Sequence, residues 1–253
     1  EVFKKRVEEK AAKSKAERSK KLQPLLERFK QIQNKFRDYV LHLTRRVQAE
    51  DRKIRKVREP KEVREKKKLS LLTILHEAAT AKNNDDWQTA ENKYITAIRI
   101  DPKNAEAYHG LADVYLKQGQ TEEARETYEF VLQLEPQNDE VMIKLGELYL
   151  SKGDTKGAID YYQRAVLAND SQAARFVKLA ELLGDIKQYE TALEAIKQAV
   201  ELEPNNPKHL DILVEMSIMS GNKITAEGAY DKLRMANPEN NKLATFKERI
   251  SKL

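Results

Sequence analysis

The side chains that most often carry out acid–base or metal chemistry are scattered in this sequence. Its four histidines are His42, His76, His109 and His209, and none has a second histidine at the spacing of a metal site. There is no cysteine, so disulfide frameworks and thiolate metal sites are excluded. No glycine-rich phosphate loop, nucleophile elbow or zinc motif occurs. We therefore predict that the chain is not an enzyme and uses no cofactor and no metal.

Charge is the most concentrated chemical feature of the chain, above all in VREPKEVREKKK, residues 57–68. Residues 1–70 hold 25 Lys and Arg against 11 Asp and Glu, a net charge of +14, whereas the remaining residues hold 22 against 30, a net charge of −8. Such a run can bind phosphate, bind an acidic protein surface, or keep a helix solvated. We name as the basic arm Lys53, Arg55, Lys56, Arg58, Lys61, Arg64, Lys66, Lys67 and Lys68.

The composition predicts helices. Of the 253 residues, 40% are hydrophobic and 35% are charged, while there are only 8 glycines and 7 prolines. That is too apolar for a disordered chain. No apolar run approaches the roughly 20 residues of a membrane span. The sequence begins at Glu1 rather than at a methionine, so we leave open an anchor upstream of it.

The elements that position these charges repeat every 34 residues. Alanines recur at that spacing, at Ala90, Ala124, Ala158, Ala192 and Ala226. Four residues after each stands a large side chain: Tyr94, Tyr128, Tyr162, Ile196 and Tyr230. Prolines close the units at Pro102, Pro136, Pro204 and Pro238, with Asp170 at the one remaining place. A period of this length indicates a stacked-repeat fold.

Each unit reads as two amphipathic helices joined by a tight turn. Gly119, Gly153 and Gly221 stand where the first helix must end, because glycine tolerates the left-handed conformation of a helix terminus. Asparagines two residues after the prolines are suited to cap the next helix: Asn104, Asn138, Asn206 and Asn240. One helix pair cannot bury its apolar face alone, so the pairs are expected to stack.

The segment AYHGLADVYLKQGQTEEARETYEFVLQLEPQN, residues 107–138, resembles the tetratricopeptide repeat (TPR) family, and the resemblance extends over about residues 71–240. It departs from the pattern at Glu77, Asp170, Leu183 and Ser217. The resemblance implies an all-α, right-handed solenoid of five helix-turn-helix repeats with a C-terminal capping helix. The expected repeats are 71–104, 105–138, 139–172, 173–206 and 207–240, the cap is 241–253, and a basic helical segment, 1–70, precedes them.

The resemblance also implies a concave partner-binding groove, lined by fixed places of each first helix. The ninth place of successive repeats holds acids, which we call the acidic series: Asp113, Glu147, Glu181 and Glu215. At the sixth place, Lys144 and Lys178 each precede an acid by three residues and can pair with it. The fifth and twelfth places supply His109 and the apolar residues Ile143, Val177, Leu116, Leu150 and Ile218. These acids are either a hydrated inner face or the site of a ligand with basic residues.

Two activities known in relatives are not expected here. The family's carboxylate clamp for chain termini needs Lys at the fifth place and Asn at the ninth, where this chain has His109 with Asp113 and Ile143 with Glu147. RNA-binding relatives have a period of 35 residues, and an acidic groove repels phosphate. We expect no nucleic-acid binding by the repeats.

The segment before the repeats has apolar residues three and four apart from Leu22 to Val47, which predicts an amphipathic helix over 22–58. Its stripe could pack on the repeats, pair with a second copy as a coiled coil to give a homodimer, or lie on an anionic membrane. A nucleic-acid arm is a further reading, which the interleaved acids of VREPKEVRE disfavour. Opposite charge could also dock the arm on the acidic repeats.

From these observations we predict a scaffold or adaptor that binds a protein or peptide with basic and apolar residues. The predicted location is the cytoplasm. In the alternative, the protein is membrane-associated, the basic arm contacts anionic lipid at the inner face of a membrane, and the repeats recruit partners there.

Overall fold

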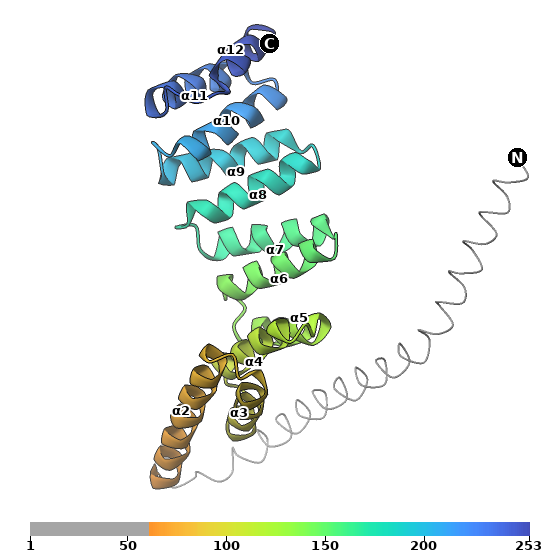
Figure 1. The fold of residues 1–253 in the computed structure, drawn as a ribbon, viewed down its shortest axis with the longest axis vertical. Coiled ribbons are helices and arrows are strands. Elements are labelled where there is room, and N and C mark those ends of the chain that lie inside the picture. Colours follow the sequence, from red (N-terminus) through yellow and green to blue (C-terminus); the bar gives the residue numbers. More distant parts are fainter. Residues whose placement is uncertain (1–60) are drawn as a thin grey trace, which may run out of the picture. The chain divides into compact units, whose positions relative to one another are not determined.

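The computed structural model describes residues 61–253, and every regular element in this range is an α-helix. The helices belong to two compact units: the first ends at Asn104 and the second begins at Ala105 (Figure 1). The predicted helix over 22–58 and the arm residues Lys53, Arg55, Lys56 and Arg58 lie outside the described residues.

The described part of the first unit is a pair of packed helices, α2 (Lys61–Asn83) and α3 (Trp87–Ile100). Leu75 and Ala78 of α2 are buried, as are Ala90 and Tyr94 of α3. Helix α2 runs without a break through the predicted boundary at residue 70, and residues 62–70 are all exposed. The basic residues from Arg64 to Lys68 therefore belong to the same helix as the first buried repeat positions.

The second unit contains four helix pairs and a final helix, in which each helix packs against the next. Its helices are α4 (Ala105–Lys117), α5 (Thr121–Leu134), α6 (Asp139–Ser151), α7 (Thr155–Ala168), α8 (Ala173–Asp185), α9 (Tyr189–Leu202), α10 (Pro207–Met219), α11 (Lys223–Ala236) and α12 (Leu243–Ser251). In Figure 1 the pairs from α6 to α11 follow one another in chain order. The predicted all-α, helix-turn-helix architecture is confirmed.

Burial of the small alanines explains why each pair closes tightly. Ala90, Ala124, Ala158, Ala192 and Ala226 all have 0% of their surface exposed. An alanine at the contact lets two helix backbones approach, and the large side chain four residues later fills the space beside it. Tyr128 and Ile196 are 0% exposed in this position, and Tyr162 is 4% exposed.

The turns and some of the caps also follow the predicted pattern. Gly119, Gly153 and Gly221 have φ of 76°, 78° and 72°, and Asp85 and Lys187 hold the same place of their repeats with φ of 59° and 63°. Asn138 and Asn206 cap α6 and α10 by accepting hydrogen bonds from the backbone N–H of Val141 and Lys208. Asn240 does not cap the next helix as predicted: it accepts a hydrogen bond from the N–H of Lys242, which is itself the N-terminal cap residue of that helix. Helix α8 follows Gln172, which makes no side-chain capping bond.

The last helix, α12, covers the end of the core as predicted. Its Phe246 is 1% exposed and its Ile250 is 6% exposed. Both belong to one buried cluster with Val214 of α10 and Leu233 of α11. The cap therefore completes a core that the preceding pair leaves open.

Replacing Gly146 should test how close the helices of one pair are. A Cβ at this position would lie 2.8 Å from Cε2 of Tyr162, whose ring is only 4% exposed and has little room to move. Overpacking costs about 1–3 kcal/mol, which exceeds the gain of up to about 1 kcal/mol from replacing a helical glycine. We expect Gly146→Ala to lower the urea midpoint of unfolding.

The matched control is Gly228→Ala in α11, where a Cβ would meet nothing within 4 Å. Only the propensity gain of up to about 1 kcal/mol remains there, so the midpoint should rise. If both substitutions moved the midpoint in the same direction, the contact between Gly146 and Tyr162 would not limit the packing of α6 on α7.

Candidate functional site

The acidic series lies on the first helix of each pair in the second unit. Asp113 is on α4, Glu147 on α6, Glu181 on α8 and Glu215 on α10. Asp113 is half-buried, and the side chains of Glu147 and Glu181 are 55% and 47% exposed. The last three carboxylates are accessible to solvent and hence to a ligand.

Two buried tyrosines show that successive acids are near one another. Burial raises the pKa of Tyr128, and so do its hydrogen bond to Asp113 and the charges of Asp113 and Glu147. Burial likewise raises the pKa of Tyr162, with further contributions from Glu147 and Glu181. Each tyrosine on a second helix therefore lies within electrostatic reach of two consecutive acids, and Glu181 and Glu215 line the same surface pocket.

Every acid of the series has a partner within the chain. The two predicted lysine pairs are present: Lys144 Nζ lies 3.7 Å from Glu147 and Lys178 Nζ lies 3.6 Å from Glu181. Both pairs are largely exposed and contribute at most about 1 kcal/mol each. A ligand cation can therefore displace either lysine from its acid at a small cost in free energy.

The partners at the two ends of the series are of a different kind. The hydroxyl group of Tyr128 donates a hydrogen bond to Asp113, with an O–O distance of 2.5 Å. Arg249 of α12 forms an ion pair of 2.8 Å with Glu215. The sequence analysis missed both partners. The place of Tyr128 behind the alanine could have suggested the first, whereas the second depends on how α12 packs.

The apolar residues expected in the groove fall into two groups. Ile143, Val177 and Leu150 are partly buried against the main cluster, and Leu116 is half-buried. They keep some surface beside the acids. Ile218 differs, because it is 8% exposed and belongs to the core cluster; it supports the surface from beneath.

His109 packs against the tyrosine that binds Asp113. Its ring centroid lies 5.8 Å from that of Tyr128. Its Nε2 atom is buried and has no hydrogen-bond partner. The structure thus brings together three residues of the α4–α5 pair, in which Tyr128 contacts both His109 and Asp113.

Five residues of the basic arm are in the described range. They occupy the first turns of α2: Lys61, Arg64, Lys66, Lys67 and Lys68. Every residue of the stretch 62–70 is exposed, including Val63 and Leu69 at 41% and 68%, and Leu72 just beyond it is 54% exposed. This part of α2 is therefore both basic and apolar at its surface.

Among residues 61–253, no group of three or more His, Asp or Glu side chains is placed to hold a metal ion. No helix of that same range combines the length and apolar character needed to cross a bilayer.

Helix pairs repeated at one spacing, with exposed charges on the first helix of each pair, define a helical-repeat protein. Three models of the tetratricopeptide repeat family match the sequence, over residues 83–129, 109–174 and 173–206. The chain belongs to the tetratricopeptide repeat family. A comparison with curated proteins finds no match.

Solved structures show the same fold. The MamA protein is 20% identical, with a TM-score of 0.56, and the match covers 68% of this chain and 94% of MamA. YrrB, a TPR protein with an unusual peptide-binding site, is 21% identical with a TM-score of 0.55, over 69% of this chain and 90% of YrrB. A tetratricopeptide repeat protein from Parabacteroides merdae is 18% identical with a TM-score of 0.56, over 72% of each chain.

The hydrogen bond from Tyr128 to Asp113 should be a measurable source of stability. A hydrogen bond to a charged group contributes about 1.5–3 kcal/mol, and the Tyr128 side chain is fully buried. We expect Tyr128→Phe to lower the free energy of unfolding by about that amount. Tyr162→Phe is the matched control, since no hydrogen bond of the Tyr162 hydroxyl is found among the described residues. Equal losses in the two variants, measured by urea denaturation, would contradict this account.

Proposed function

We propose that this protein is a non-enzymatic scaffold that binds a partner protein or peptide over the acidic series, and that the bound segment carries basic and apolar side chains. The observation that carries the proposal is the place of Glu147, Glu181 and Glu215 on successive first helices of one unit, with Glu181 and Glu215 lining one pocket. The tetratricopeptide fold supports protein–protein interaction, and the peptide-binding site of YrrB supports a peptide ligand.

The charges favour a cationic ligand because the existing pairs are weak. Lys144 and Lys178 each lie more than 3.5 Å from their acids and are themselves partly exposed. A ligand cation that reaches an acid and also buries apolar surface gains more than such a lysine does. Ile143 and Val177 beside the acids offer that apolar surface.

Charge reversal of the series should abolish this binding. We expect the full chain to select Lys- or Arg-containing peptides with apolar neighbours from a random peptide-display library. In Glu147→Lys/Glu181→Lys/Glu215→Lys, the reversed face repels the same peptides, so their affinity should fall by about a hundredfold or more. Fluorescence polarisation with labelled peptides measures the loss.

The control carries the same charge change on second helices. Asp160, Glu194 and Asp231 are exposed acids on α7, α9 and α11, and each is paired with a basic residue three or four positions later. Asp160→Lys/Glu194→Lys/Asp231→Lys should bind the selected peptides as the unaltered chain does. Selection of acidic peptides, or equal losses in the two triple variants, would refute the proposal.

A second candidate function is contact with an anionic membrane through the start of α2. The observation that favours it is the exposure of residues 62–70, which combine basic side chains with Val63 and Leu69 and are followed by the exposed Leu72. Lysines at an anionic surface contribute about 1 kcal/mol each, and apolar side chains add partitioning into the interface. The repeats would then recruit partners at the inner face of a membrane.

Co-sedimentation of the full chain with vesicles tests this second function. Vesicles of phosphatidylserine and phosphatidylcholine should bind the chain, less so as salt rises, and pure phosphatidylcholine should not. Lys66→Glu/Lys67→Glu/Lys68→Glu should weaken binding by about a hundredfold, whereas the control Lys156→Glu/Lys223→Glu/Lys232→Glu, on α7 and α11, should not. Binding that is insensitive to salt, or equally weakened by both variants, would exclude a lipid role for α2.

A further inference from the structure

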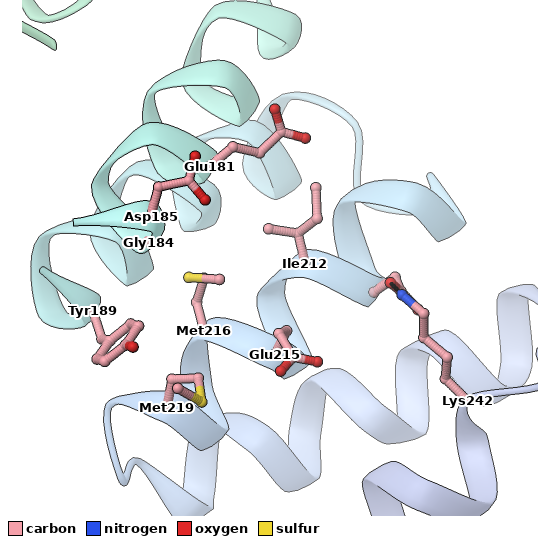
Figure 2. Close-up of a pocket in the computed structure, with 10 residues that line it drawn as sticks. Glu181, Gly184, Asp185, Tyr189, Ile212, Glu215, Met216, Met219 and Lys242 are labelled. Atoms are coloured by element: carbon pink, nitrogen blue, oxygen red, sulfur yellow. Dashed lines mark hydrogen bonds and ion pairs between the residues drawn. The ribbon is translucent and has the colours of Figure 1, made fainter. Parts of the chain in front are cut away.

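A pocket of about 340 Å³ opens between α8 and α10, at one end of the acidic series. Its walls include Glu181 and Asp185 of α8 and Asp211 and Glu215 of α10. Its floor is apolar and consists of Ile212, Met216 and Met219, with Tyr189 at the start of α9. Figure 2 shows Met216 between Gly184 on α8 and Glu215 on its own helix.

One wall of the pocket has an unusually small side chain, because Gly184 of α8 is among its lining residues. Gly184 holds the twelfth place of its repeat, where the other repeats of this unit have Leu116, Leu150 and Ile218. A Cβ on Gly184 would lie 3.1 Å from both Cε and Sδ of Met216. The space that a leucine side chain fills in other repeats is occupied here by Met216, whose flexible side chain can adapt to a ligand beside it.

The two walls of the pocket differ in how their charge is compensated. On α10, Asp211 pairs with Lys242 at 2.5 Å and Glu215 pairs with Arg249 at 2.8 Å. On α8, Glu181 has only the loose pair with Lys178, and Asp185 forms no ion pair within the described part of the chain. The α8 wall therefore retains negative charge that a ligand can meet.

Arg249 shows within this molecule how an arginine binds next to the pocket. One guanidinium nitrogen contacts Glu215, and the other lies 3.4 Å from Sδ of Met219. A carboxylate and a thioether thus hold one arginine from the α10 side. The α8 wall offers carboxylates of the same kind across from Met216.

We propose that this pocket anchors the partner segment and takes an arginine beside an aliphatic residue. The guanidinium binds Glu181 and Asp185, and the aliphatic side chain packs on Ile212 and Met216. The inference rests on the proposed function, because the pocket belongs to the same surface, and it names the side chains that the surface recognises.

The methionines of the chain provide a direct test. There are four: Met216 and Met219 line the pocket, Met142 is 3% exposed in the core, and Met235 is 78% exposed on α11. In the full chain with ¹³C-labelled methionine methyl groups, N-acetyl-Arg-Leu-amide should shift the signals of Met216 and Met219 alone when titrated to about 10 mM. N-acetyl-Glu-Leu-amide should shift neither. Absence of a shift at Met216, or an equal shift at Met235, would overturn the proposal.

Substitutions separate the pocket from the wider groove. Gly184→Leu fills the space without changing any charge and should weaken probe binding at least about tenfold, whereas Gly228→Leu, at a position open to solvent, should not. Asp185→Asn alters only an exposed residue, so it keeps the test valid if Gly184→Leu fails to fold. It should weaken the probe several-fold, and Asp160→Asn is its control.

The outcomes distinguish this inference from the proposed function. If the display-selected peptides lose binding on reversal of the acidic series but bind Gly184→Leu and Asp185→Asn unchanged, the pocket is refuted and the scaffold function stands. If no basic peptide is selected and the probe still shifts Met216 in a way that depends on Asp185, the pocket stands and the extended groove is refuted.

Discussion

The close approach of the two helices in each pair is the constraint on which the rest of the structure depends. It is possible because an alanine with no exposed surface stands at the same place in every pair. Once this contact is fixed, the large residue four positions later is directed into the space beside it, and the orientation of the first helix is set. The ninth place of that helix then faces outward, which is why Glu147 and Glu181 are accessible while Tyr162 is buried behind them.

Periodicity was sufficient to predict the helices, the turns and the caps Asn138 and Asn206, whereas the caps of the second helices, Asp86, Asp154 and Asn222, were not predicted. The alanines, the glycines of positive φ and the capping asparagines act within one or two helices, so each leaves a local trace in the sequence. The lysine partners of Glu147 and Glu181 were predictable for the same reason, because three residues separate each pair on one helix. The continuity of α2 across residue 70 was not predicted, since the repeat pattern begins only at about residue 71.

The rest of the site could not be predicted because it depends on contacts between elements far apart in sequence. Arg249 reaches Glu215 across 34 positions and Lys242 reaches Asp211 across 31. Both contacts depend on how α12 and the residue before it pack against α10. In the sequence, the only sign of the pocket beside them is Gly184, at a place where the other repeats of the second unit have Leu or Ile. The position of Met216 is needed to connect this glycine with the pocket.

Helix α12 has a consequence for assembly. An array of identical stacking units resembles a growing filament, because the apolar face that receives the next unit can also receive the first unit of another molecule. Phe246 and Ile250 cover that face at the C-terminal end, and the ion pairs of Lys242 and Arg249 fix the helix that carries them. Helix α12 thus closes the stack on this side, and its removal would leave the apolar face of α10 and α11 exposed to stacking by another helix pair.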